Sequence, residues 1–505
     1  PSGPVPVLCA TMALDPRTPV VVGSGQVVQR ASGLDDARSP VELMAEAVDA
    51  AAADAGLAGV PAVDAIRVVQ LLSWRYRDPA RFVAERLGVS PREHAYTTGG
   101  GNTPQMLVNL TADEIQRGEL DIAVLAGGEA WRTRMRARRA GVELWDRVPE
   151  DVEPNRVIGH DVSMTHPAEQ ARGLLMPVQV YPMFETALRA AAGESVDEHQ
   201  TKVSELWSRF SAVAAANPYA WVRRHLSAEE IRTPGPDNRM IGFPYPKYMN
   251  SNNDVDQAAA VIMCSVDKAR SLGIAEDRWV FVHSGADTHE HYYVSNRWRF
   301  DETPAIRIGG ARALSLAGKS IDDIDLVDLY SCFPSAVQLG AASLGLSLDR
   351  QLTRTGGLPF AGGPWNNYVM HGIATLCTHL RDGQGRTGLV WGNGGFATKH
   401  SFGVYSTEPS PTGFRHDSPQ AEVDAMPSRA LAEPPDAAGS ATVEAYTVMH
   451  TRSGEPETAF AACLLSDGRR AWGTSHDADL AAAMCEGEWV GRAVTLDETG
   501  TLVAL

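Results

Sequence analysis

The chain has 505 residues, 44% of them apolar, and a formal net charge of −17. This length exceeds the size at which a single hydrophobic core stops growing, so we expect two or three globular domains. A strongly acidic chain is repelled by nucleic acid and by anionic membranes, and no apolar run reaches the roughly 18 residues of a membrane span. We therefore expect no nucleic-acid partner and no membrane span. Because no signal sequence is recognisable, we expect a cytoplasmic location.

The six cysteines show no paired or metal-ligand spacing, which predicts reduced thiols and no metal site. His289 and His291 alternate along one predicted segment and leave a metal site as the weaker alternative. Residues 1–17 are rich in proline and lack a periodic pattern, so we expect them to form a flexible extension.

From residue 18 onward, short apolar runs alternate with amphipathic segments, which indicates an α/β sheet covered by helices. The turn TTGGG (97–101) precedes the third of these helices, and Asn102 is expected to cap that helix. Three glycines at a helix start leave backbone N–H groups accessible to an oxyanion or a thioester carbonyl. Strands are predicted at 20–28, 64–73 and 121–128, and helices at 39–56, 78–88 and 105–115.

The second half of the chain repeats this plan. Apolar residues at helical spacing also predict a helix over 196–216, between the two halves. Two copies of one strand and helix plan indicate a pseudo-symmetric, five-layered domain. The predicted elements of the second copy are a helix at 252–273, a strand at 278–286, a helix at 304–320, and a strand, turn and buried helix at 324–346.

Beyond residue 405 the composition changes. Residues 406–440 are rich in proline and alanine, as in a linker. Residues 441–505 predict three strands, a helix and two strands, which is the order of an OB-fold barrel. This segment is acidic and has few aromatic residues, which disfavours binding to nucleic acid. Docking on the rest of the chain, or helping to gate a ligand pocket there, fits the charge better.

Four segments carry a resemblance to a known family. They are Ile115 and Gly118 followed by DIAVLAGGE, then SNNDVDQAAAV (251–261), GGLPFAGGP (356–364) and GNGGF (392–396). Over residues 18–405 these segments resemble the thiolases, within them the sterol-carrier-protein-type branch, and within that branch the thiolase-like proteins of type 1.

The resemblance implies a fold and its domains. It implies an α/β, five-layered αβαβα thiolase fold with pseudo-symmetric halves at 18–270 and 271–405. A loop domain at 130–250 is inserted in the first half. After the linker at 406–440, residues 441–505 resemble the appended C-terminal domain of the type 1 proteins, an antiparallel, OB-like β-barrel.

The catalytic residues of the family are mostly replaced in this chain. The nucleophilic cysteine of thiolases aligns with Gly101, and the histidine that activates it aligns with Gly363. The family's HDCF motif aligns with YSCF, so its histidine becomes Tyr330, its aspartate becomes Ser331, and its cysteine remains as Cys332. Loss of the nucleophile and its base implies that acetyl-CoA acetyltransferase activity is absent.

Cys332 and Tyr330 are the remaining catalytic candidates. A thiol at the start of a buried helix has a lowered pKa, which favours the thiolate, whereas an inert buried thiol is the alternative. Tyr330 could donate a hydrogen bond to a thioester oxygen. His371, in the helix after the GGP turn, is a candidate for the same pocket or for the core.

Positive charge in the middle of the chain is a candidate for the phosphates of coenzyme A. The tentative contacts are Arg132, Arg134, Arg223 and Lys247. Three hypotheses follow. The protein binds CoA thioesters of lipid metabolism as a carrier, sensor or partner subunit; it is an acyltransferase or C–C bond enzyme of altered chemistry that uses Cys332; or it is an interaction protein acting through the C-terminal barrel. Both a monomer and a homodimer fit the resemblance.

Overall fold

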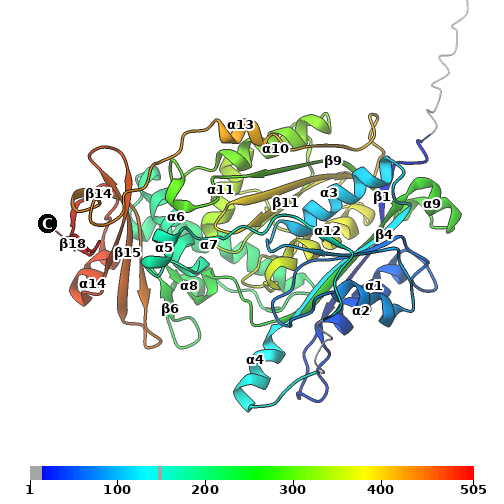
Figure 1. Cartoon of the computed structure of the whole chain (residues 1–505), viewed down its shortest axis with the longest axis horizontal. Coiled ribbons are helices and arrows are strands. Elements are labelled where there is room, and N and C mark those ends of the chain that lie inside the picture. Colours follow the sequence, from blue (N-terminus) through cyan, green and yellow to red (C-terminus); the bar gives the residue numbers. More distant parts are fainter. Residues whose placement is uncertain (1–13, 146–150, 505) are drawn as a thin grey trace, which may run out of the picture.

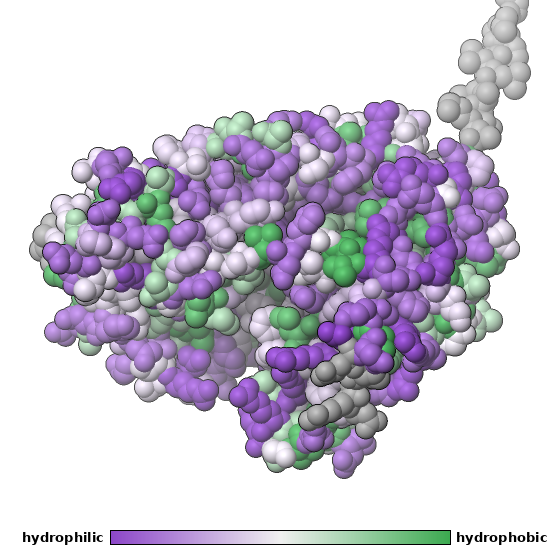
Figure 2. Space-filling view, in the orientation of Figure 1, coloured by the Kyte–Doolittle hydropathy of each residue, from purple (hydrophilic) through white to green (hydrophobic). Residues whose placement is uncertain are grey.

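The computed structural model describes residues 14–145 and 151–504 (Figure 1). The flexible extension expected at 1–17 lies mostly outside these residues. Within the described residues, no helix is both long enough and apolar enough to cross a membrane. On the face seen in Figure 2, hydrophilic residues cover most of the surface and hydrophobic residues form separate patches.

The first half of the chain builds one side of a large sheet. Strand β8 lies antiparallel between β1 and β4, and β2, β3 and β5 continue the sheet in parallel. In spatial order these strands are β1 (Pro19–Val28), β8 (Asp256–Ser265), β4 (Ile122–Ala130), β2 (Ala65–Val68), β3 (Glu93–Thr97) and β5 (Arg156–Ile158).

The second half builds the other side, and a short pairing of β1 with β9 joins the two. Strand β13 adds to β9 in parallel, so the segment expected to be a linker returns to the core sheet. In spatial order the strands are β10 (Leu326–Leu329), β11 (Thr387–Gly394), β12 (Lys399–Ser406) and β9 (Val280–His289), with β13 (Arg415–Asp417) beside β9.

Helices cover both sheet halves and separate them. Helices α3 and α12 lie between the two halves, and each contacts strands of both. Helices α1 and α2 cover the outer face of the first half, and α10 and α11 cover that of the second (Figure 1). This confirms the five-layered thiolase fold. The bounds are α1 (Pro40–Asp54), α2 (Pro79–Leu87), α3 (Thr103–Gln116), α10 (Pro304–Leu316), α11 (Pro334–Leu344) and α12 (Tyr368–Arg381).

One predicted element is wrong. The helix expected over 252–273 is strand β8 followed by the short helix α9 (Val266–Ser271). All ten residues of β8 are buried, because strands flank it on both edges and helices cover both faces. A strand buried on both faces has no alternating pattern, so its alanine-rich run has the composition of a helix.

The middle of the chain forms a mostly helical layer. Helix α7 spans Val196–Ala216, as predicted, and begins with a capping box between Ser195 and Glu198. The other elements are α4 (Trp131–Ala140), α5 (Pro167–Ala171), α6 (Pro177–Ala192), α8 (Ala228–Arg232), β6 (Met240–Gly242) and β7 (Tyr245–Pro246). Single 3₁₀ turns occur at Lys247–Met249, Glu276–Arg278, Val294–Asn296, Ile321–Asp323 and Trp365–Asn367.

A second, antiparallel sheet lies at the opposite end of the molecule from β1 (Figure 1). Its elements follow the predicted order of three strands, a helix and two strands. A parallel bridge between Thr474 and Thr501 connects its two edges, and β6 pairs with β14. The bounds are β14 (Gly439–His450), β15 (Pro456–Leu465), β16 (Arg470–Ser475), α14 (Ala478–Glu486), β17 (Ala493–Leu496) and β18 (Leu502–Ala504), with α13 (Gln420–Asp424) preceding them.

A buried polar contact ties this sheet to the rest of the chain. The fully buried Arg470 donates through Nη1 to the backbone carbonyls of Val294, Ser295 and Arg297, at 2.6–3.0 Å. Its guanidinium also pairs with Glu444 at 2.8 Å. A buried arginine with this many acceptors fixes the position of the C-terminal sheet on the thiolase-like body.

Candidate functional site

The glycine turn lies at the N-terminus of α3, in the centre of the thiolase-like body. A Cβ atom on Gly101 would lie 2.5 Å from the backbone oxygen of Asn393 and 2.6 Å from the hydroxyl of Tyr330. Both distances are too short for real contacts. The space that a side chain at position 101 would need is therefore already filled, in part by Tyr330 itself.

The expected cap at Asn102 is wrong. Asn102 stands at the N-cap position, but its side chain accepts no hydrogen bond from the helix. Instead its Nδ2 donates to Ser401 Oγ at 3.2 Å, and its Oδ1 is buried with no partner in the described part of the chain. The residue has helical φ and ψ angles at this position, so its oxygen does not reach the first free N–H groups.

Gly363 is closed in a similar way. Its Cβ would lie 2.4 Å from Ser251 Oγ. The backbone N–H of Gly363 donates to Asn252 O at 2.9 Å, and Asn253 Nδ2 donates to Gly363 O at 2.6 Å. Residues 251–253 thus lie against the GGP turn and take the space that a histidine at position 363 would occupy.

Cys332 does not have the lowered pKa expected from its place before α11. The thiol is buried, and burial raises its pKa to about 12. A hydrogen bond from Tyr181 lowers the pKa, but by less than burial raises it. Among the described residues, no cation stabilises the thiolate, and the helix start does not lower the pKa below its usual value. The side chain is a neutral thiol at neutral pH.

Tyr330 belongs to a packed aromatic group. Its ring meets that of Tyr368 edge-on at 5.6 Å, and burial raises its pKa well above the usual value. The Tyr368 hydroxyl shares hydrogen bonds with Thr355 Oγ1 at 2.5 Å and with Ser331 Oγ at 3.2 Å. The rings of Tyr330 and Tyr368 and the hydroxyls of Ser331 and Thr355 therefore fill this part of the structure, with the Tyr368 hydroxyl bonded to both of the smaller ones.

His371 lies one turn further along α12. Its Nδ1 is 2.9 Å from Gln26 Oε1, while its Nε2 is buried and has no partner among the described residues. Burial lowers its pKa to about 3, so the ring is neutral. A small cavity touches His371, Tyr368 and Gly362, which places the histidine beside the aromatic group.

The four tentative phosphate contacts do not come together. Arg134 donates to the backbone oxygen of Leu72, and Arg223 and Lys247 are exposed on other segments. Arg132 lines a pocket of about 200 Å³ whose other basic residues, Arg30 and Arg136, were not predicted. Arg132 and Arg136 are four residues apart on α4 and so share one face, a spacing that the sequence contains.

Trp221 forms one wall of this pocket, which we call the arginine pocket (Arg30, Arg132, Arg136 and Trp221). The guanidinium of Arg30 lies 4.5 Å from the centre of the Trp221 ring. Arg132 pairs with Asp254 at 2.6 Å, whereas Arg30 and Arg136 donate only to backbone carbonyls. The backbone N–H of Trp221 donates to Ala361 O, so the pocket adjoins the GGP turn.

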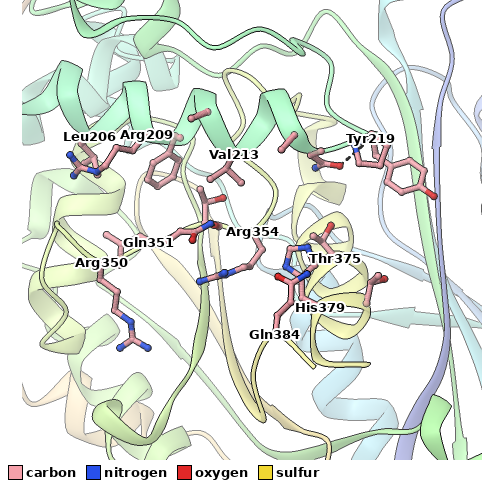
Figure 3. Close-up of a pocket in the computed structure, with 18 of the residues that line it drawn as sticks. Leu206, Arg209, Val213, Tyr219, Arg350, Gln351, Arg354, Thr375, His379 and Gln384 are labelled. Atoms are coloured by element: carbon pink, nitrogen blue, oxygen red, sulfur yellow. Dashed lines mark hydrogen bonds between the residues drawn. The ribbon is translucent and has the colours of Figure 1, made fainter. Parts of the chain in front are cut away.

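A larger cavity, of about 700 Å³, lies between α7 and the far half of α12 (Figure 3). It touches none of Gly101, Tyr330, Cys332 and Gly363. Its basic residues, Arg209, Arg350 and Arg354, were also not predicted. They come from two segments about 140 residues apart, and no local pattern links them.

No metal site emerges near the histidines of β9. His289 stacks on Tyr292 with ring centres 4.2 Å apart, and its Nδ1 bonds to Glu290 O. Over residues 14–145 and 151–504, no group of three or more His, Cys, Asp or Glu is placed to hold a metal ion.

Comparisons with known proteins agree with this arrangement. The fold and the aligned site define a thiolase-fold protein. Residues 419–501 match the family described as the thiolase-like protein type 1 additional C-terminal domain. A search of curated proteins finds no match.

Solved structures narrow the assignment. The chain is 34% identical to a monomeric SCP2-thiolase-like protein type 1 from Mycobacterium smegmatis, over 96% of this chain and 98% of that chain, with a TM-score of 0.81. The chain therefore belongs to the SCP2-thiolase-like proteins of type 1.

More distant structures share the fold alone. The Ltp2-ChsH2(DUF35) aldolase is 19% identical over 77% of this chain and 98% of that chain, with a TM-score of 0.59. Human mitochondrial 3-ketoacyl-CoA thiolase in complex with CoA is 19% identical over 78% of this chain and 99% of that chain, with a TM-score of 0.56.

Proposed function

We propose that this protein binds a CoA thioester with a lipid-type acyl group and holds it without forming an acyl-enzyme, as a carrier, sensor or partner subunit. The observation that carries the proposal is the arginine pocket beside the GGP turn, where the space that a histidine at position 363 would need is filled. The arginines of the pocket are able to bind a phosphate group. The filled turn leaves no room for the side chains that carry out the thiolase reaction.

The absence of a nucleophile supports the second part of the proposal. Loss of a covalent nucleophile from a cooperating catalytic set costs on the order of a millionfold in turnover. Cys332 is a weak replacement, because a thiol with a pKa of about 12 is almost entirely protonated at neutral pH. The hypothesis of altered chemistry through Cys332 is therefore the less favoured one.

The charge of the arginine pocket supports the first part. Asp256 also lines the pocket, but its carboxylate accepts hydrogen bonds from Thr133. Arg30 and Arg136 have no carboxylate partner within salt-bridge distance in the described chain, so a phosphate could bind both guanidiniums. Trp221 offers an aromatic face on which an adenine could stack. A thiolase of the same fold has been solved with CoA, which is in line with this ligand.

One comparison supports a monomeric chain. The similar mycobacterial protein is monomeric. The C-terminal sheet, which we propose to be an OB-like barrel, docks on its own chain through Arg470. The five described cysteines are all free thiols, which fits the proposed cytoplasmic location.

Calorimetric titration with CoA and decanoyl-CoA, followed by intact-mass measurement of the same samples, tests the proposal. We expect binding without a mass increase. Arg136→Gln should weaken binding by roughly tenfold, because a charge-assisted hydrogen bond is lost. Arg138→Gln is the matched control, because Arg138 is exposed on the same helix and lies outside the pocket. Equal affinities of the two variants, or an acyl adduct, would contradict the proposal.

A further inference from the structure

The cavity between α7 and α12 has an apolar wall. Leu206, Phe210 and Val213 come from one face of α7, and Leu352 comes from the loop after α11. Leu206, Phe210 and Leu352 are each at most 2% exposed, so they form a fixed surface. The volume of about 700 Å³ falls within the range of roughly 300–1,000 Å³ of small-molecule sites.

Three guanidinium groups lie around one end of this cavity. Figure 3 shows Arg209 and Arg350 at that end, Arg354 pointing toward them from the middle, and Tyr219 at the opposite end. Arg209 donates to Leu348 O at 2.8 Å, and Arg350 donates to backbone carbonyls of residues 321–325. Carbonyl groups satisfy hydrogen bonds but leave the net positive charge in place.

No carboxylate within the described residues lies within 4 Å of these three guanidiniums. The Nε atom of Arg354 is buried and has no hydrogen-bond partner in the same part of the chain. Asp349, the one acidic residue among those lining the cavity, is exposed. Asp328 lies behind the loop and accepts from the backbone N–H of Arg354 at 2.7 Å. Asp328 and Asp325 offset part of the charge of Arg354 and Arg350 without forming a salt bridge to them, so an anion in the cavity would meet guanidiniums that have no bonded carboxylate and one unused donor.

We infer that this cavity binds an amphipathic carboxylate, such as a medium-chain fatty acid. The carboxylate lies between Arg209, Arg350 and Arg354, and the alkyl chain lies along Leu206, Phe210 and Val213 toward Tyr219. Guanidinium groups bind carboxylates through paired hydrogen bonds, and the apolar wall removes the chain from water.

This site is separate from the proposed CoA site. The residues that line the cavity and those that line the arginine pocket have no member in common. The end near Tyr219 continues, through Gln26 and Asn217, into the small cavity at His371. The chain end of the ligand would thus point toward the filled thiolase site, and the two ligands are able to bind independently.

Calorimetry with decanoate tests the inference. We expect decanoate to bind and methyl decanoate to bind more weakly. Any signal from inorganic phosphate should be the same in the unmodified protein and in Arg354→Gln, because the arginine pocket is a separate site. Arg354→Gln should weaken decanoate binding about tenfold or more, because a charge-assisted hydrogen bond is lost. Arg307→Gln, an exposed arginine on α10, should leave it unchanged. Val213→Trp should abolish binding by filling the cavity, with circular dichroism and thermal unfolding as checks that the variant folds.

Three outcomes would overturn the inference. The first is equal affinity of Arg354→Gln and Arg307→Gln for decanoate, and the second is no binding of decanoate to the unmodified protein. The third is phosphate binding that Arg354→Gln removes, which would mean an anion site that does not use the apolar wall. CoA titration of Val213→Trp separates this from the proposed function. Unchanged CoA affinity is expected, and failure of CoA to bind any sample would sink the proposed function and leave the decanoate result standing.

Discussion

The two ends of helix α12 offer opposite surroundings to a ligand. At its first residue, Tyr368 packs on Tyr330, and the Tyr330 hydroxyl fills the space above Gly101. Near its last turn, Thr375 and Thr378 face a cavity of about 700 Å³ with unpaired guanidinium groups. The end beside Gly101 is therefore closed, and the far end is open.

This difference teaches where the scaffold has room for a ligand. At the closed end, side chains pack over two glycines, with Tyr330 over Gly101 and Ser251 over Gly363. Close packing makes the insertion of a larger side chain at either glycine costly. At the open end, guanidinium groups beside an apolar wall have no salt bridge within the described chain. A cavity of this kind suits an anionic ligand with an apolar part. Four experiments test this contrast, in order from the largest expected effect to the smallest.

The first test probes the closed end with a thiol reagent. With its pKa raised to about 12, Cys332 in the folded protein should react with iodoacetamide on the order of a thousandfold more slowly than in the urea-unfolded chain. Peptide mass mapping at mildly alkaline pH gives both rates. Rapid labelling of Cys332 in the folded state would mean that this end is open and reactive.

The second test restores the missing nucleophile. Gly101→Cys should lower the free energy of unfolding by about 3 kcal/mol, because the new Cβ meets a backbone oxygen that cannot move aside. Gly59→Ala is the control, since a Cβ there meets nothing within 4 Å. Urea unfolding measures both. A Gly101→Cys variant as stable as the parent would show that the turn has room for a side chain.

How far the sequence predicts these features depends on whether the signal is local. The α/β layering, α7 and the order of the C-terminal elements follow from apolar spacing, whereas the alignment of Gly101 and Gly363 with the nucleophile and the base of thiolases stays a prediction. Strand β8 was mistaken for a helix because a strand buried on both faces has no alternation. The filling of the site could not be predicted, because it depends on where Tyr330 and Ser251 lie in space.

The cavity at the open end also could not be predicted from the sequence, because it too depends on where residues lie in space. Arg209 and Arg354 are far apart in the chain, and only folding brings them to one cavity. Arg132 and Arg134 were both predicted to contact a phosphate, but helix geometry decides that Arg132 and Arg136 face the pocket and Arg134 does not.

The third test concerns His371, between the two ends. In the folded chain the pKa of His371 is about 3, below the value of about 6.5 expected in the unfolded chain. As the pH falls, the unfolded chain therefore takes up a proton on His371 before the folded chain does. The neutral, buried ring contributes fully to the free energy of unfolding above about pH 6.5, and this contribution is lost as the pH falls. From about pH 6.5 to about pH 5, the parent should lose roughly 2 kcal/mol more than His371→Gln. Urea titrations at each pH measure the difference, and parallel curves would contradict the buried, neutral histidine.

The smallest effect is expected at the open end. Arg354→Met should change the free energy of unfolding by less than about 1 kcal/mol, because it removes a partly buried cation whose Nε has no acceptor in the described chain, and keeps an apolar side chain of similar length. Urea unfolding gives the value, with Arg307→Met as an exposed control. A loss well above 2 kcal/mol would make Arg354 a structural residue and remove the contrast between the two ends. Unchanged stability combined with lost decanoate affinity would mean that the charge serves a ligand and not the fold, since a cation that only stabilised the protein could not be removed without cost.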